Sequence, residues 1–387
     1  LDSFRMESIA TTVQFLRPGD WMITLDMWQS YHALRLRSGA SDGDALDMRP
    51  YACFTWRGRV LQWQVTPYGL NVAPHRYQKA MLKIFGPWRE AGIRSASYIN
   101  DSLIAATSPD ELIERRDKRI LPDLARYGLI VNREKAQVHP AQAVRFLGHI
   151  IDTSGSHVRL FVPQDKLEAM IGLAKRLLSA SEGSSPVSGH DVASLVGKVM
   201  SMSQALPPAR LMTRGLIGDL HQLPLREWRS DDGSWIVVRD FSKTVVLSEE
   251  SLFNLRWLVE RSADFNGAEW HSAAATRTLY TDASKRMRGA VVRRVVDGIE
   301  GDVSAWSQGE IELPEDARTS TYTELESAML SLAETEDLDG QTVLLRTDSI
   351  ATMWGLVRGG YAVGANALLN LLATKIMAIC MVRGIRL

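Results

Sequence analysis

The chain has 387 residues, of which 45% are hydrophobic and 23% are charged, and its 45 basic side chains balance its 45 acidic ones. This length is more than one ordinary hydrophobic core accommodates, so we expect two or three soluble globular domains. A net charge of zero argues against binding of nucleic acid over the whole surface, although it is compatible with a local basic groove.

The cysteine content and the apolar runs exclude further classes of protein. Cys53 and Cys380 are too few for a disulfide framework or a zinc site, which favours a reducing, intracellular compartment, either cytoplasm or nucleus. The longest apolar run, residues 367–382, is interrupted by polar side chains, so it predicts an amphipathic helix and no membrane span. Because the chain starts at Leu1 and not at Met, we expect it to be a piece of something longer.

The first predicted elements lead up to a lone carboxylate and a loop. A buried strand over residues 21–25 ends on Asp26. Two aromatic and β-branched runs, 51–56 and 59–63, flank a two-residue turn with a glycine and predict a hairpin. Proline and glycine in 66–74 predict a loop, and the apolar spacing after it predicts a helix.

The run Tyr98-Ile99-Asn100-Asp101 is the most unusual feature of the sequence. It lies between the small residues 95–97 and the apolar-rich segment 102–106, at the tip of a predicted strand–turn–strand. Asp26 ends another predicted strand, and oxygen ligands at strand ends are what a hard divalent cation requires. The sequence therefore predicts a metal site here.

Together, these segments resemble the palm of a reverse transcriptase. Asp26 is similar to the carboxylate of that family's motif A, residues 66–74 to its motif B loop, and 98–101 to its Tyr-x-Asp-Asp. Residues 128–135 and 146–152 resemble its Lys-bearing segment and its primer-grip strand pair. Five motifs in the family's order make a specific match.

The resemblance implies phosphoryl transfer, in which a primer 3′-hydroxyl attacks the α-phosphorus of a deoxynucleotide on an RNA template. Two Mg²⁺ ions, or Mn²⁺ in their place, would stabilise the attacking and leaving oxygens. It makes Asp26 and Asp101 metal ligands, assisted by the carbonyl of Met27, and places Asn100 among the catalytic residues. Tyr31 would exclude a ribose 2′-hydroxyl. The implied nucleotide and template contacts are Tyr31, Tyr68, Gly69, Leu70, Tyr98 and Lys135.

Two residues depart from the family's pattern. Asn100 stands where the family has the first Asp of its pair, and Gln29 stands where it often has a second motif A Asp. An amide offers one neutral oxygen, so the site loses negative charge at the metals. Since altering even the partners of ligands costs about 10–100-fold, we expect impaired activity; a tolerated variant is the alternative.

The middle of the chain predicts a series of helices. An amphipathic helix begins at Pro163, a Ser- and Gly-rich linker covers 179–186, and a second amphipathic helix covers 192–200. Ser248 opens a further helix. These helices would be a thumb and connector. The basic side chains of the first helix are either a solvated face or a surface that lies along a duplex groove.

The last third resembles ribonuclease H. A strand over 279–284 carries Asp282, a helix carries Glu324, and a strand over 342–349 carries Asp348; these three match the family's first three acids. Glu326 is the rival for the helical position. The resemblance implies that metal-activated water hydrolyses the RNA strand of an RNA–DNA hybrid. A fourth acid is expected after a strand over 383–387, where the chain stops. Residues 1–8 resemble the stretch just before motif A, so we also expect the preceding fingers strands to be missing.

The expected fold is α+β, with a reverse-transcriptase palm (a ferredoxin-like antiparallel sheet with helices), a helical thumb and connector, and a ribonuclease H-like α/β domain. The expected domains cover 1–152, 153–275 and 276–387. Short runs narrow the resemblance to DIRS-type (tyrosine-recombinase) retrotransposons, with gypsy-like elements and pararetroviruses next; these runs are 4–8, 19–22, 266–267 and 358–360. The expected partners are an RNA template, a DNA primer, RNA–DNA hybrid, deoxynucleotides and other polyprotein segments, but no membrane. The competing hypothesis is an inactive or co-opted copy that only binds nucleic acid or a protein.

Overall fold

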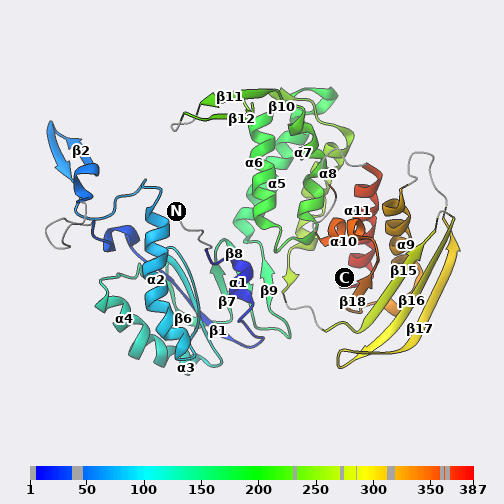
Figure 1. Ribbon diagram of the computed structural model, residues 1–387, viewed down its shortest axis with the longest axis horizontal. Coiled ribbons are helices and arrows are strands. Elements are labelled where there is room, and N and C mark those ends of the chain that lie inside the picture. Colours follow the sequence, from blue (N-terminus) through cyan, green and yellow to red (C-terminus); the bar gives the residue numbers. More distant parts are fainter. Residues whose placement is uncertain are drawn as a thin grey trace. The chain divides into compact units, whose positions relative to one another are not determined.

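The computed structural model describes residues 6–36, 47–229, 233–270, 274–284, 286–311, 319–357, 361 and 367–387. The chain divides into two compact units, Leu1–Pro163 and Gln164–Leu387. Both combine helices with β-sheet (Figure 1), which confirms the predicted α+β class. Within the described part of the chain, no helix has the length and apolar character that crossing a bilayer requires. The domain boundaries at 152 and 275 stay predictions, and the runs 4–5 and 358–360 lie outside the described residues.

A four-stranded antiparallel sheet forms the centre of the first unit. Its strands, in spatial order, are β4 (Arg94–Tyr98), β5 (Asp101–Ala106), β1 (Trp21–Asp26) and β6 (Gln137–Ala141). β1 and β5 are largely buried, as their apolar sequences predict, and they pair along their whole length. Because β1 ends where β5 begins, this register places Asp26 directly opposite Asp101.

Helices pack on this sheet and bury its apolar side chains. They are α2 (Ala73–Glu90), α3 (Pro109–Arg115) and α4 (Leu121–Arg126), with a π-helical turn, Arg116–Ile120, between the last two. Figure 1 shows α2 lying along the sheet. Tyr77, Phe85 and Trp88 of α2 are buried in one core with Ile23 and Ile104 of the strands. The helical apolar spacing of the sequence therefore corresponds to a face that packs on the sheet.

The remaining elements of the first unit are short. They are α1 (Ile9–Val13), the 3-10 turns Ser30–Ala33 and Arg49–Tyr51, the hairpin β2 (Cys53–Trp56) and β3 (Arg59–Gln62), and the strands β7 (Ala143–Phe146), β8 (His149–Asp152) and β9 (Arg159–Phe161). The hairpin has the predicted two-residue turn. α2 begins at Ala73, inside the predicted loop, because Pro74 in a first helical turn lacks only an N–H that would have no helical partner.

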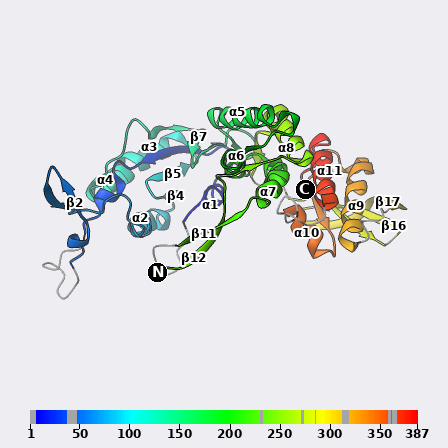
Figure 2. The ribbon, with the colours of Figure 1, turned by 90° about the horizontal axis from the view of Figure 1, so that it is seen from above.

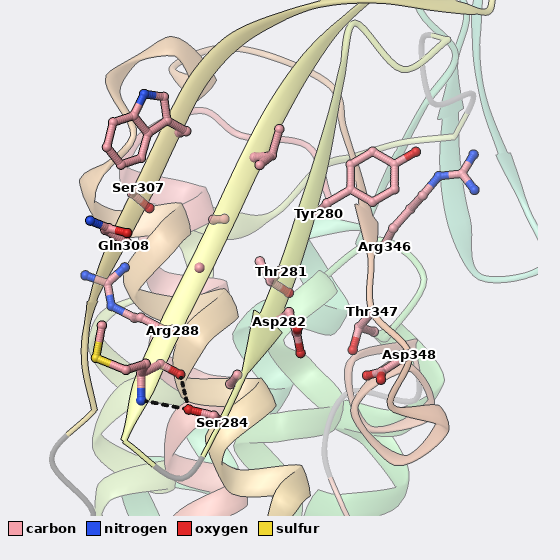
Figure 3. A pocket seen from close by; sticks show the side chains of 16 residues that line it. Tyr280, Thr281, Asp282, Ser284, Arg288, Ser307, Gln308, Arg346, Thr347 and Asp348 are labelled. Atoms are coloured by element: carbon pink, nitrogen blue, oxygen red, sulfur yellow. Dashed lines mark hydrogen bonds between the residues drawn. The ribbon is translucent and has the colours of Figure 1, made fainter.

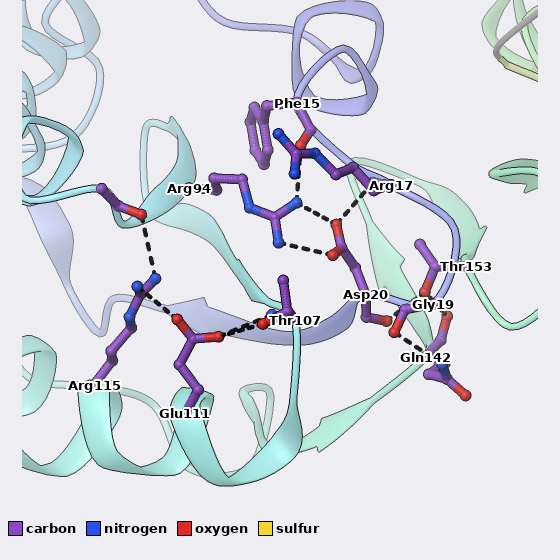
Figure 4. A network of polar contacts seen from close by, with 11 residues as sticks. Phe15, Arg17, Gly19, Asp20, Arg94, Thr107, Glu111, Arg115, Gln142 and Thr153 are labelled. Carbon is purple, nitrogen blue, oxygen red and sulfur yellow. Dashed lines mark hydrogen bonds and ion pairs between the residues drawn. The ribbon is translucent and has the colours of Figure 1, made fainter.

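A buried network of polar contacts joins the start of β1 to β4 (Figure 4). Asp20 precedes β1 and is only 2% exposed. Its carboxylate forms an ion pair with Arg94 of β4 and accepts the backbone N–H of Arg17 at 2.7 Å. The guanidinium of Arg94 also donates to the carbonyl of Phe15 at 3.1 Å, and Thr153 donates to the carbonyl of Asp20 at 2.6 Å. This network holds the sheet at the end opposite Asp26.

The second unit begins with four helices that pack against one another (Figure 2). They are α5 (Gln164–Ala180), α6 (Gly189–Met202), α7 (Arg214–His221) and α8 (Glu249–Glu260). α5 follows Pro163 and α8 follows Ser248, which confirms both predicted starts. The shorter elements here are the strand pairs β10 (Val187–Ser188) with β13 (Thr244–Val245) and β11 (Leu225–Arg229) with β12 (Trp235–Arg239), the strand β14 (Ala268–Glu269), and the 3-10 turns Glu182–Ser184, Pro207–Thr213 and Ser262–Phe265.

A second four-stranded sheet follows in the same unit. Its spatial order is β17 (Ile299–Glu310), β16 (Met287–Val296), β15 (Arg277–Ala283) and β18 (Val343–Arg346). The helices of this part are α9 (Ser320–Glu334), α10 (Ile350–Val357) and α11 (Ala367–Val382), with a 3-10 turn, Glu336–Leu338. β15 and β18 run parallel and the other pairs are antiparallel. Leu279 of β15, Leu325 of α9 and Leu372 of α11 share one buried core. The helix predicted over 367–382 is therefore confirmed.

Candidate active sites

Asp26, Asn100 and Asp101 come together where β1 and β5 meet. Asp101 is the first residue of β5 and pairs with Asp26, the last residue of β1. The amide nitrogen of Asn100 donates a hydrogen bond to the Oδ2 atom of Asp26 at 2.9 Å. Asn100 thus satisfies one oxygen of the Asp26 carboxylate, and it presents its N–H group, not its amide oxygen, to that carboxylate.

The electrostatics of this pair follow from burial and from a neighbouring lysine. Burial raises the pKa of Asp101 above its ordinary value, and the negative charge of Asp26 raises it further. The positive charge of Lys135 acts in the opposite direction on the same pKa. Two carboxylates that share a partly buried site repel each other, and a cation relieves that repulsion.

A pocket of about 290 Å³ opens beside the pair and collects most of the predicted residues. Its lining residues are Asp26, Met27, Trp28, Gln29, Ser30, Tyr31, Tyr68, Ile99, Asn100, Asn132 and Lys135. Asp101 itself is half-buried at the start of β5, an inner strand of the sheet. Gly69, Leu70 and Tyr98 do not line the pocket: the first two lie in the loop before α2, and Tyr98 pairs with Asp101 across the 98–101 turn. Their predicted roles in substrate binding stay predictions.

Aromatic rings form one wall of this pocket. The ring of Tyr31 lies 5.3 Å from that of Tyr68 and 5.7 Å from that of Tyr77, measured between centroids. Burial raises the pKa of the Tyr31 hydroxyl, so it stays protonated at neutral pH. Gln29 lies nearby with a left-handed backbone, φ 47°, and also lines the pocket. Both residues that depart from the family's pattern, Gln29 and Asn100, therefore line the same pocket as Asp26.

Two further residues belong to the neighbourhood of this site although the sequence pattern did not single them out. Asn132 lines the pocket, and its backbone N–H donates to the carbonyl of Asp26 at 2.8 Å. Gln78 of α2 accepts the N–H of Ile99 in the 98–101 turn and donates to the carbonyl of Ser97 just before it. The available signal for Gln78 was a single amide on the apolar face of a predicted helix, which alone indicates burial and no particular role.

The donor set of the site suits a Mg²⁺ ion. Among the described residues, no group of three or more His, Cys, Asp or Glu is placed to hold a metal. Mg²⁺, however, keeps several waters in proteins and is commonly bound through one or two carboxylates together with substrate phosphates. Asp26 and Asp101 provide those two carboxylates. The residues present therefore fit the ion, with fewer anionic ligands than the family's pattern has.

A second group of acids lies in the other sheet (Figure 3). Asp282 near the end of β15 and Asp348 after β18 line a pocket of about 980 Å³, because parallel strands end at the same edge. Glu324 of α9 is 6% exposed, and its Oε1 atom accepts the N–H of Ala283 at 3.3 Å. Burial raises the pKa of Glu324, and the charges of Asp348 and Asp282 add to that rise.

The rival acid on α9 faces a different neighbour. Burial raises the pKa of the Tyr322 hydroxyl and the charge of Glu326 raises it further, whereas the pKa of Glu324 is raised by burial and by Asp348 and Asp282. Ser327 of α9 donates to the carbonyl of Asp282 at 3.3 Å, so this serine ties α9 to β15. Which of Glu324 and Glu326 is the helical acid of the site stays a prediction, and this geometry favours Glu324.

Sequence comparison relates the first unit to known proteins. A family model described as reverse transcriptase (RNA-dependent DNA polymerase) matches residues 2–151. The Tf2-3 transposon polyprotein of Schizosaccharomyces pombe is 32% identical over 131 residues, and the Tf2-7 polyprotein of the same yeast is 31% identical over 131 residues. Each match covers 34% of this chain and 9% of the relative's length, so the chain spans a small part of these polyproteins.

Structural comparison extends the likeness over the chain. The foamy viral protease–reverse transcriptase in complex with double-stranded DNA matches 99% of this chain and 69% of its own, with a TM-score of 0.57 and 15% identity. The same viral protein in complex with an RNA/DNA hybrid matches 100% of this chain and 46% of its own, with a TM-score of 0.54 and 14% identity. At such identities the likeness concerns the fold alone. The sequence match thus relates residues 2–151 to the reverse transcriptase family, and the matched relatives are retrotransposon polyproteins.

Proposed function

We propose that this chain is part of an RNA-directed DNA polymerase of a retrotransposon, which extends a DNA primer with deoxynucleotides on an RNA template. The observation that carries the proposal is the placement of Asp26 opposite Asp101 at the ends of two paired strands, inside a domain of the reverse transcriptase family. Because the chain spans 9% of its Tf2 relatives, other segments of a polyprotein are expected partners.

The residues of the pocket have distinct parts in the proposed reaction. Asp26 and Asp101, with the carbonyl of Met27, would hold Mg²⁺ or Mn²⁺, which when bound offsets the charge of the reacting phosphates. Tyr31, packed between Tyr68 and Tyr77, is a rigid wall against a ribose 2′-hydroxyl. Lys135 supplies a positive charge on the same pocket, where nucleotide phosphates would lie. Gly69, Leu70 and Tyr98 are proposed to position template and nucleotide from the loop and the turn.

The polymerase activity is proposed to be impaired by Asn100. Its N–H group is bonded to Asp26, so it both removes a negative charge and occupies a carboxylate oxygen that a metal ion would use. The test is primer extension on an RNA template by the unmodified chain and by Asn100→Asp, where we expect a gain of at least about tenfold. Asn132→Asp is the matched control, since it adds the same charge to the same pocket without replacing the Asp26 hydrogen bond. Full activity of the unmodified chain, or equal gains in both variants, would contradict this role.

A second proposed activity is ribonuclease H cleavage of RNA in an RNA–DNA hybrid. Its support is that Asp282 of β15 and Asp348, just after β18, line one pocket, and that burial together with the charges of these two acids raises the pKa of Glu324 on α9. Among the described residues these three do not form a ready metal cluster, so they would hold Mg²⁺ or Mn²⁺ together with the phosphates of the hybrid. Asp282→Asn is expected to abolish cleavage of the RNA strand while primer extension continues. Loss of both activities together would instead indicate a folding defect.

Two finer questions remain proposals. We favour a DIRS-type element on short runs such as residues 266–267, with gypsy-like and pararetroviral polymerases as the alternative, because the Tf2 relatives are gypsy-like. The alternative function is an inactive copy that binds nucleic acid or a protein partner, and the hydrogen bond between Asn100 and Asp26 is the observation in its favour. Titration of Mn²⁺ followed by electron paramagnetic resonance separates the two, since only the polymerase requires a metal that depends on Asp26 and Asp101.

A further inference from the structure

We propose that Gln78 is a positioning residue that holds the 98–101 turn in its working shape, with Glu7 as its partner on the outer edge of β4. This role rests on the proposed polymerase function, because it concerns the turn that carries Asn100 and Asp101. The turn itself consists of Tyr98-Ile99-Asn100-Asp101 and joins β4 to β5.

Gln78 makes two hydrogen bonds at the start of the turn, one on each side of Tyr98. It lies on α2, is 1% exposed and is surrounded by the apolar core side chains Tyr77 and Met81. Its amide nitrogen donates to the carbonyl of Ser97 at 2.8 Å, and its amide oxygen accepts the backbone N–H of Ile99 at 2.7 Å. A buried amide uses both its donor and its acceptor here, which a carboxylate, a hydroxyl or an apolar side chain of the same length does not reproduce.

The turn needs such support because its backbone is strained. Ile99 has φ 52°, in the left-handed region that a β-branched side chain rarely adopts. A residue keeps this strained backbone conformation only where contacts with the surrounding structure hold it, and such residues are frequent at functional sites. The N–H that Ile99 presents in this conformation is the one that Gln78 accepts. Without that acceptor, Ile99 is free to relax to negative φ and to turn Asn100 away from Asp26.

Two other contacts complete the support. β4 is the terminal strand of the sheet, and the outward backbone N–H of Ser97 donates to the Oε2 atom of Glu7 at 2.6 Å. Glu7 is held in turn by an ion pair of 2.6 Å with Arg89 at the end of α2. On the other side, the carbonyl of Asn100 accepts the N–H of Met27 at 2.9 Å. α2 therefore acts on this region twice, directly through Gln78 and, by way of Glu7, through Arg89.

The test is hydrogen exchange at single backbone amides, measured by ¹⁵N NMR on the full chain. In Gln78→Leu, we expect the amide of Ile99 to exchange on the order of tenfold faster, since it loses its acceptor. The amide of Leu103, in the middle of β5, reports on general stability and should change far less. Asn254→Leu is the matched control: Asn254 is another buried amide, 3% exposed, which accepts the N–H of Gly215 at 3.1 Å in the second unit. Asn254→Leu should leave the exchange rate of the Ile99 amide unchanged.

A second measurement separates positioning from simple stability. Gln78→Leu should lower kcat for primer extension about tenfold while KM for the deoxynucleotide stays within about twofold, because the turn is displaced but the pocket wall remains. Gln78→Glu keeps the acceptor for Ile99 and should restore most of the protection of that amide. The proposal is overturned if Ile99 and Leu103 accelerate equally, or if Ile99 keeps its exchange rate in Gln78→Leu. Exchange does not depend on catalysis, so a chain that extends no primer even as Asn100→Asp would refute the proposed function and leave this test decisive.

Discussion

Replacement of Asp20 by asparagine is the sharpest test of how the first unit is held together. Asp20→Asn keeps the size of the side chain but removes its charge. The guanidinium of Arg94, whose side chain is 20% exposed, then lies beside the 2% exposed position 20 without its counter-ion. Removing one partner of a buried ion pair costs about 3–5 kcal/mol. Because water reaches part of Arg94, we expect the free energy of unfolding of this unit to fall by about 2–4 kcal/mol.

The assay must report on this unit alone, since the chain contains two. Hydrogen exchange of β1 amides, followed by mass spectrometry across a urea series, does so. The double variant Asp20→Asn with Arg94→Met should lose less stability than the sum of its single variants, because it leaves no unpaired charge. Glu114→Gln is the control: Glu114 pairs with Lys118 on the surface, where both side chains are more than half exposed, and its loss should leave the stability unchanged. A loss below about 1 kcal/mol in Asp20→Asn, or strict additivity in the double variant, would refute the reasoning.

Three further predictions concern other parts of the chain. Burial raises the pKa of the Cys380 thiol to about 11, so a thiol reagent at pH 8 should label the exposed Cys53 and reach Cys380 only after unfolding. Since the unfolded thiol titrates near 9.0, the contribution of neutral Cys380 is present below that pH and is lost as the pH rises toward 11, which a pH series of urea melts would detect. The buried carboxylate of Asp219 accepts the N–H of Ser248 at 2.8 Å at the start of α8. Asp219→Asn should therefore lower the free energy of unfolding by about 1–3 kcal/mol. An unchanged melting curve would contradict this. Because the pKa of Glu324 is raised, its charged form opposes folding, so Glu324→Gln should stabilise the fold at pH 7 and lose this advantage at pH 4. The same variant should no longer cleave the RNA–DNA hybrid. A destabilised variant would instead indicate that Glu324 is held mainly by its bond to Ala283.

Local sequence patterns predicted the elements of this protein well where apolar spacing is strong. The helix over 367–382, the start of α8 at Ser248 and the two strands that end at Asp26 and begin at Asp101 are all found in the structure. These elements could be predicted from the sequence because burial of one helical face or one strand depends on nearby residues only. The start of α2 within the predicted loop was not accessible, since Pro74 is compatible both with a loop and with a first helical turn.

The residues proposed to carry the chemistry were predicted from the sequence alone: the carboxylates at two strand ends and the amide at position 100, from an order of motifs that matches the reverse transcriptase family. The hydrogen bond of Asn100 to Asp26 is seen only in the folded chain, because it joins residues that are 74 positions apart. The same holds for Gln78, which looks like any buried amide on a helix until α2 meets the 98–101 turn. The physical reason is that a hydrogen bond has direction: composition and spacing predict that a polar group is present, but the packing of distant elements decides which atom it meets.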